Sequence, residues 1–503
     1  MALVSVTVGV GAAGAQKSAK IDPAARLVYG MNMSGGGFSQ RLQPAAMTAI
    51  CDATVGNQVF GTLIRRDTAT NKPVPNLAES WKIVDPNTFE FKLRPGLTFQ
   101  DGTKLDAAAA KASLDANRAS TSKLAPTLSG ISSIEAGADG LTVTLRMSTP
   151  TAGVMPLTLA GREGMLAAAA STDTNPIGAG PFKFDSQVVG QEIKLSKFPG
   201  YWDAKNVKLA GIDMVHTETG SAVNSVIAGD LDMVDGGADV NKPAEHNPDV
   251  EILSPPGADY WKLNLNTAKP PFDNVDFRKA LNYALDKKVI AETLFGPTAE
   301  VATQSYPKSF VDQYQKDLAG RYPYSVKKAK AALKASGVTL PVAVEMQIPA
   351  NNPGFSRFAE IVQAQLKEVG INVSITPSPN LLTTFFQNKQ GQFITTLWPA
   401  RPDPSVTIGR NFTPNQITNA GNNLSPEIPV ALAEIQAAQT PAEARAGYKK
   451  AINIIVDNAY EVPVFFPRLS NVHRTYVTSD DWQVYGACQG IDFSKVAITT
   501  AKK

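Results

Sequence analysis

The chain has 503 residues, which exceeds one ordinary hydrophobic core and predicts two or three domains. Hydrophobic residues make up 43% and charged residues 18%, a composition that excludes a disordered chain. The net charge of +3 is small and scattered, which argues against nucleic-acid binding. No stretch beyond the N-terminus approaches about 18 consecutive apolar residues, so we expect none of it to cross a bilayer.

The N-terminus predicts an export signal over residues 1–15. Ala2 to Ala15 contains no charge and ends in a small-x-small cleavage pattern, Ala13-Gly14-Ala15, before Gln16. A basic segment before the apolar run is missing, which a truncated or wrongly chosen start codon would explain, and the alternative is a disordered apolar tail. No cysteine follows the run, so we expect a free periplasmic protein without a lipid anchor.

Two cysteines, Cys51 and Cys488, lie near opposite ends of the chain. In an oxidising compartment they could form one disulfide bridge. The alternative is a pair of buried thiols that act as small hydrophobic side chains.

The first predicted elements come before residue 120. A strand is predicted over Leu27 to Met33, followed by the glycine run 35–37, which either lets a ligand approach the backbone or is only a loop. Helical spacing follows over Ala45 to Leu63. Apolar residues then alternate over 88–93, as in a strand, and Asp106 is placed to cap an alanine-rich helix.

The stretch from Trp261 to Asp286 reads as a strand, a rigid turn and a helix. Polar and apolar residues alternate up to Asn266, two consecutive prolines then prevent strand pairing, and Asp276 offers a side-chain acceptor to the free amides of a helix start. Phe277 and the apolar residues at helical spacing after it form one stripe.

Four stretches resemble a single family. They are PNLAESW with the strand, turn and capped helix that follow it, IGAGPFKF with EIKLSKFPGYW, SVIAGDLDMVDG, and WKLNLNTAKPPFDNVDFRKALNYALD. Together they are similar to the extracellular solute-binding proteins of family 5, the peptide-, oligopeptide- and nickel-binding proteins of ABC importers. Matches extend from about residue 27 to about residue 410, most of the chain.

The resemblance implies an α/β fold of the periplasmic binding protein type II kind, with two lobes around a ligand cleft and an extra inserted domain. Residues 20–56, 186–266 and 470–503 would form a discontinuous lobe I, residues 57–185 an inserted domain II, and residues 267–469 lobe III. Both cysteines would then fall in lobe I. The implied function is capture of a small solute, a peptide, opine or similar molecule, by a monomer in the periplasm, followed by hinge closure and delivery to the permease subunits.

One loop departs from the family pattern. Peptide-binding relatives carry a tryptophan and then an aspartate that pairs with the ligand's α-ammonium, but here Arg401 stands where that aspartate is expected, while Trp398 is kept. A guanidinium favours a carboxylate or phosphate over an amine, so we expect an anionic or uncharged solute. The alternative is that Arg401 points to solvent or bridges two domains. Asp403 is interpreted mainly as a helix cap, with Pro404 at the first helical position.

The candidate ligand-binding residues lie in these loops and beside them. Aromatic side chains among them could stack on peptide side chains or sugars. The set is Met33, Ser34, Phe38, Tyr260, Trp261, Asn264, Trp398, Arg401 and Asp403.

Catalytic chemistry has no support in the sequence. His216, His246 and His473 are far apart, with no second ligand at metal spacing, so we expect no catalytic residue, metal site or cofactor. The remaining alternatives are a periplasmic chaperone or adhesin, a sugar, opine or metal-chelate binder on the same fold, or a periplasmic enzyme.

Overall fold

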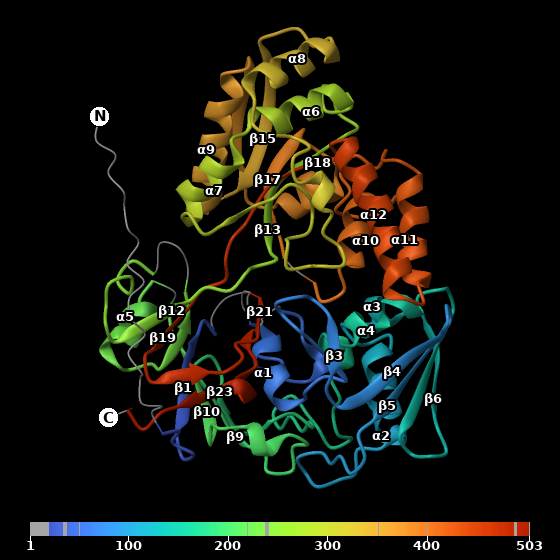
Figure 1. The fold of residues 1–503 in the computed structure, drawn as a ribbon, viewed down its shortest axis with the longest axis vertical. Coiled ribbons are helices and arrows are strands. Elements are labelled where there is room, and N and C mark those ends of the chain that lie inside the picture. The colour runs from blue at the N-terminus through green and yellow to red at the C-terminus, as the bar shows by residue number, and fades with distance from the viewer. Residues whose placement is uncertain are drawn as a thin grey trace, which may run out of the picture.

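The computed structural model describes residues 20–33, 38–49, 51–218, 220–236, 241–350, 352–399, 401–486 and 490–501. The predicted export signal, Ser34 and Cys488 lie outside this part of the chain. No helix in the described ranges is long and apolar enough to span a bilayer. The fold is mixed α/β, as predicted, with two bodies stacked one above the other (Figure 1).

We propose that lobe I, domain II and lobe III are each built on one of the three large sheets. The proposed lobe I contains a seven-stranded sheet, whose strand β8 begins at Phe182, before the predicted boundary at residue 186. Its strand order is β12 (Val250–Leu253), β19 (Asn471–Arg474), β11 (Met233–Asp235), β1 (Arg26–Met31), β10 (Gly211–His216), β9 (Glu192–Lys197) and β8 (Phe182–Val188). Strand β1 runs parallel to both β10 and β11, and the other pairs are antiparallel. The rest of this lobe comprises α1 (Asp52–Val59), α5 (Ala222–Ala228), β20 (Val477–Ser479), β21 (Val484–Gly486), β22 (Gly490–Ile491) and β23 (Val496–Ile498).

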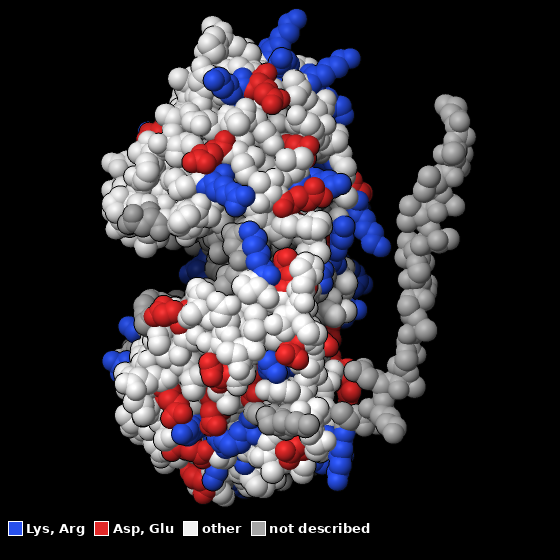
Figure 2. Space-filling view, turned by 90° about the vertical axis from the view of Figure 1, so that its left-hand side faces the viewer, with Lys and Arg blue, Asp and Glu red and all other residues white. Residues whose placement is uncertain are grey.

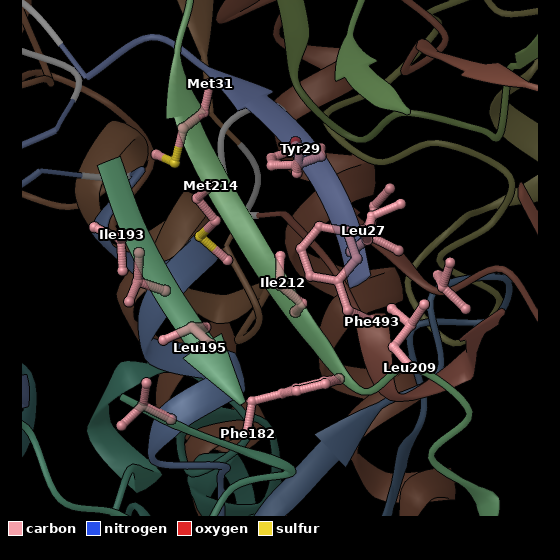
Figure 3. Close-up of a cluster of buried hydrophobic side chains, with 14 of the residues drawn as sticks. Leu27, Tyr29, Met31, Phe182, Ile193, Leu195, Leu209, Ile212, Met214 and Phe493 are labelled. Carbon is pink, nitrogen blue, oxygen red and sulfur yellow. The ribbon is translucent and has the colours of Figure 1, made fainter. Parts of the chain in front are cut away.

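The core of lobe I lies against β1, β9 and β10 (Figure 3). Alternate residues of β1 supply Leu27 and Tyr29, and alternate residues of β10 supply Ile212 and Met214. The ring of Tyr29 packs edge-on at 5.0 Å from that of Phe493, so the C-terminal segment helps to close this core.

The helix predicted over Ala45 to Leu63 is shorter than expected. The structure has a single helical turn at Pro44–Ala46, and α1 begins only at Asp52. The Asp52 carboxylate accepts hydrogen bonds from the amides of Ser39, Thr48 and Ala49, at 2.7, 3.0 and 2.9 Å. These upstream amides therefore fold back onto Asp52 instead of continuing a helix.

Domain II is built on a four-stranded antiparallel sheet. Its order is β4 (Ala78–Asp85), β5 (Thr88–Leu93), β7 (Thr142–Met147) and β6 (Ile131–Ala136). Helices α2 (Ala107–Arg118), α3 (Ala125–Leu128) and α4 (Met155–Thr158) and the short pair β2 (Ile64–Arg66) and β3 (Pro73–Pro75) accompany it. The predicted cap is confirmed, because the Asp106 side chain accepts hydrogen bonds from the amides of Ala108 and Ala109, each at 3.1 Å.

Lobe III is built on a six-stranded sheet. Its order is β14 (Glu300–Val301), β18 (Glu461–Phe466), β13 (Tyr260–Leu265), β17 (Phe393–Trp398), β15 (Val342–Pro349) and β16 (Ile371–Ser378). Its helices are α6 (Val275–Ala284), α7 (Lys287–Phe295), α8 (Val326–Ser336), α9 (Pro353–Lys367), α10 (Ser405–Phe412), α11 (Glu427–Ala437) and α12 (Pro441–Asp457). Helices α10 to α12 form a group beside the sheet, facing domain II (Figure 1).

Strand β13 differs from its prediction in one respect, since all six of its residues are buried. The strand lies inside the sheet between β17 and β18, so its polar positions are covered as well as its apolar ones. The predicted boundary at residue 266 would put this strand in lobe I, yet its hydrogen-bonded partners belong to lobe III. We therefore propose that lobe III begins within the connection 254–259.

Helix α6 is capped by a different residue from the one predicted. The side chain of Asn274, not Asp276, accepts hydrogen bonds from the first amides, at 2.9 Å from Asp276 N and 3.2 Å from Phe277 N. Asp276 lies within the first turn, too late to take the capping position.

The chain passes between the two bodies twice, in segments 254–259 and 467–470. These segments are bonded to each other: the Leu469 amide donates to the Pro255 carbonyl at 3.0 Å, and Ser254 Oγ donates to the Leu469 carbonyl at 3.3 Å. A Cβ on Gly257 would lie 2.2 Å from the Pro467 carbonyl oxygen, so only glycine permits this approach. Two adjacent connections of this kind form a hinge.

Candidate functional site

A cavity of about 620 Å³ lies between the two bodies. Its lower wall comes from α1, β2, α3 and α4, and its upper wall from α10, α11 and the loop before α10. Figure 2 shows the surface notched at this level. The volume is within the usual range for small-molecule sites.

The walls of the cavity are basic. Six basic and three acidic side chains line it, which gives a formal charge of +3. They are Arg65, Arg66, Lys123, Arg162, Arg401 and Arg410, with Glu163, Asp403 and Asp492. Arg65 and Asp492 neutralise each other in an ion pair of 2.6 Å. The cavity therefore presents a positive field to an entering solute.

Arg401 lies in the upper wall and is mostly buried there. Its Nε has no hydrogen-bond partner, and within the described residues its guanidinium forms no ion pair. Burial lowers the pKa of Arg401, and the nearby charges of Arg410 and Arg162 lower it further. A buried guanidinium without a counter-ion is costly, and an anionic group in the cavity would remove that cost.

Asp403 follows Arg401 on the same wall. Its carboxylate accepts hydrogen bonds from the Ser405 amide and the Ser405 hydroxyl, both at 2.9 Å. Helix α10 begins at Ser405, one residue later than predicted, so Asp403 does bond to a helix-start amide while Pro404 occupies the capping position. Burial raises the pKa of Asp403 to about 6, so this carboxyl offsets little of the positive charge in mildly acidic conditions.

Two predicted site residues near the N-terminus lie in the core of lobe I. Met33 and Phe38 are both buried there and do not line the cavity. Ser34 lies outside the described residues.

Three predicted aromatic residues also pack away from the cavity. Trp261 stacks on Phe355 at 4.4 Å and on Phe465 at 5.6 Å inside lobe III. Tyr260 and Trp398 share a small buried cluster, and the Trp398 indole N–H donates to Thr407 Oγ1 at 3.2 Å. The sequence placed them beside the cleft, but their rings fill lobe III.

A buried polar network lies next to these rings. Glu461 accepts hydrogen bonds from Lys262 Nζ at 2.7 Å, from the Tyr260 hydroxyl at 3.0 Å, and from Ser305 Oγ at 2.6 Å. Asn264, the remaining predicted site residue, lines a second cavity of about 10 Å³ beside Lys262 and Glu461. That space suits one water molecule and is too small for a solute.

Four arginines of the cavity were missed by the sequence analysis: Arg65, Arg66, Arg162 and Arg410. Three come from the lower wall and one from the upper wall, and no spacing in the sequence indicates that they face the same space. Arg65 and Arg66 are adjacent in the sequence, but they follow the predicted helix Ala45 to Leu63 and nothing in the sequence marks them as facing a cavity.

No group of three or more His, Cys, Asp or Glu side chains in the described part of the chain could hold a metal ion. His473 is mostly buried, and burial lowers its pKa. Cys51 is buried beside α1, and no described cysteine is free. Because Cys488 lies outside the described residues, the bridge between the two stays a prediction.

Comparisons with known proteins agree with this architecture. The profile of the bacterial extracellular solute-binding proteins, family 5 (middle), matches residues 72–419. The glutathione-binding protein GsiB of Shigella boydii is 27% identical over 433 residues, which cover 80% of this chain and 82% of that protein.

Two solved structures share the fold. The ABC transporter substrate-binding protein CtaP of Listeria monocytogenes superposes with a TM-score of 0.83 at 20% identity, covering 95% of this chain and 99% of that one. The periplasmic binding protein AgaA of A. tumefaciens R10, solved with agropinic acid, superposes with a TM-score of 0.72 at 24% identity, covering 94% and 99%. The chain therefore belongs to family 5 of the bacterial extracellular solute-binding proteins, the substrate-binding components of ABC importers.

Proposed function

We propose that this protein captures a small anionic solute between its lobes, with Arg401 as the principal anion-binding residue. The observation that carries the proposal is the mostly buried guanidinium of Arg401 in the cavity wall, whose Nε has no hydrogen-bond partner and which forms no ion pair within the described residues. Peptide-binding relatives carry an aspartate at the corresponding loop position, which suits an ammonium group. The opposite charge here suits a carboxylate or phosphate.

Hinge closure would then complete the site. Arg401 and Arg410 lie on the upper wall and Arg162 on the lower wall, so like charges face each other across the cavity. An anion between them reduces their repulsion and is bound more strongly when the walls approach. A ligand shifts a conformational equilibrium only by its differential affinity for the two states, and this arrangement provides such a difference.

The remaining parts of the account are proposals as well. The protein would be exported through the segment 1–15, act as a periplasmic monomer, and deliver its solute in the closed form to an ABC permease. The family match does not favour the chaperone, adhesin or enzyme alternatives.

A thermal-shift screen on protein refolded to remove carried-over ligand tests the proposal. The panel contains acidic opines, glutathione, di- and oligopeptides, sugars and nickel chelates. A bound solute at a hundredfold excess over its dissociation constant stabilises the protein by about 2.7 kcal/mol. We expect acidic members to raise the melting temperature, and Arg401→Gln to weaken their binding about tenfold or more, because a charge-assisted hydrogen bond is lost.

Arg321→Gln is the matched control. Arg321 is an exposed arginine of lobe III that pairs with Asp457 outside the cavity, so its loss should leave the shift unchanged. A clear shift with ordinary dipeptides that persists in Arg401→Gln would contradict the proposed role of Arg401.

A further inference from the structure

Arg66 is a second arginine of the cavity, and within the described residues its guanidinium forms no ion pair. It ends β2 in the lower wall, and only 5% of its surface is exposed. Its guanidinium donates to Asn71 Oδ1 at 3.1 Å and to the Tyr485 carbonyl at 2.6 Å. Both acceptors are neutral, whereas the adjacent Arg65 has a carboxylate partner in Asp492.

A purely structural arginine in the same protein looks different. Arg278 in α6 is equally buried, 4% exposed, and makes four hydrogen bonds to the carbonyl oxygens of Phe272, Asp273 and Asn458. Within the described part of the chain, Arg66 makes two hydrogen bonds with its five N–H groups. It lines the solute cavity, which Arg278 does not. Arg66 therefore has donors left over and belongs to the lining of the cavity in which a solute would lie.

The guanidiniums of Arg66 and Arg401 have similar electrostatic surroundings. Burial is the main factor that lowers the pKa of each guanidinium. Asp259, on the hinge connection before β13, attracts both arginines. Glu163 also attracts Arg401 and Asp67 also attracts Arg66, but within the described residues neither guanidinium forms an ion pair with any of these carboxylates.

We propose that Arg66 forms a second anion subsite and that the preferred solute carries two acidic groups, one bound by Arg401 and the other by Arg66. This inference rests on the proposed function, since it assumes that Arg401 binds an anion. The two arginines come from opposite walls of the cavity. A solute with an acidic group at each end would therefore bridge the two bodies, and its affinity would depend on both charges.

Calorimetric titration of the refolded full-length protein tests the subsite. The probes are linear dicarboxylates from succinate to suberate, each compared with its monoamide of equal length. In the wild type we expect at least one diacid to bind about tenfold more tightly than its monoamide, the value of one charge-assisted interaction. Arg66→Gln should still bind the monoamide, and it should bind the diacid of the same length no more tightly than the monoamide.

Arg278→Gln is the matched control, because it removes an equally buried arginine from lobe III, and it should keep the preference for the diacid. If the wild type binds diacids and monoamides equally, or if Arg66→Gln keeps the preference, the second subsite is refuted while the proposed function stands. If no acid of either kind binds the wild type, both proposals fail. Should Arg66→Gln not fold, the wild-type comparison decides alone.

Discussion

Replacing Glu461 with glutamine would leave the Lys262 ammonium buried without a counter-ion. The side chains of the two residues are 1% and 4% exposed, and Lys262 Nζ lies 2.7 Å from Glu461 Oε2. Removing one partner of a buried ion pair costs about 3–5 kcal/mol, because the other charge stays desolvated. Three aromatic rings lie 5.1 to 5.7 Å from the ammonium and offset part of this cost, so we expect about 3 kcal/mol.

Replacing the lysine of the pair instead of the glutamate should lower the free energy of unfolding by less. In Lys262→Met the Glu461 carboxylate keeps the hydroxyl donors of Tyr260 and Ser305, so we expect a loss of about 1–2 kcal/mol. The double variant, Lys262→Met with Glu461→Gln, contains neither charge of the pair. It should therefore be more stable than Glu461→Gln alone, which is a strongly non-additive result.

Urea unfolding of the four proteins measures these free energies, with each transition fitted separately because the chain has several cores. Lys279→Met is the matched control, since it removes a partly exposed ion pair with Asp276 in the same lobe and should cost at most about 0.5 kcal/mol. The reasoning is refuted if Glu461→Gln is no more destabilising than this control, or if Lys262→Met costs more than Glu461→Gln.

Three further predictions concern other parts of the molecule. Burial lowers the pKa of Lys287 to about 7, so the folded protein pays a free-energy cost to keep this lysine charged below pH 7, and the cost disappears as the pH rises to about 10. The free energy of unfolding of the wild type should therefore rise between pH 7 and about pH 10 relative to that of Lys287→Met. Parallel pH profiles of the two proteins would contradict this. Asn274→Ala should lower the free energy of unfolding, measured by chemical denaturation, by about 1 kcal/mol, and Asp276→Ala should lower it clearly less. Equal losses would instead support Asp276 as the capping residue, as predicted from the sequence. We propose a Cys51–Cys488 bridge, for which thiol counting on denatured, unreduced protein should find no reactive thiol; finding two would exclude it.

The family motifs predicted the fold because the structure of each motif depends mainly on residues within the motif. The Asp106 cap and the alternating apolar residues of β5 depend on neighbours within a few positions, and both were predicted correctly. Strand β13 was misinterpreted for the opposite reason. Lys262 reads as a solvent-facing position until Glu461, 199 residues later, is placed beside it.

The candidate site was less predictable than the fold. Arg401, which lines the cavity, was predicted as a site residue because it replaces a residue of opposite charge in a known pattern. Arg66 and Arg162 have no such pattern, and they reach the cavity only because the lobe I sheet and domain II are assembled from distant segments. The predicted aromatic residues lie in cores and do not line this cavity, since a ring near a hinge strand fills a core as readily as it lines a cleft.

The solute that the protein carries when purified natively tests the central claim most directly. Denaturing the wild-type protein and identifying the released molecule by mass spectrometry should give a small acidic solute, absent or much reduced in Arg401→Gln and fully retained in Arg321→Gln. A released solute without an acidic group, or equal recovery from wild type and Arg401→Gln, would contradict the claim that this cleft binds an anion through Arg401.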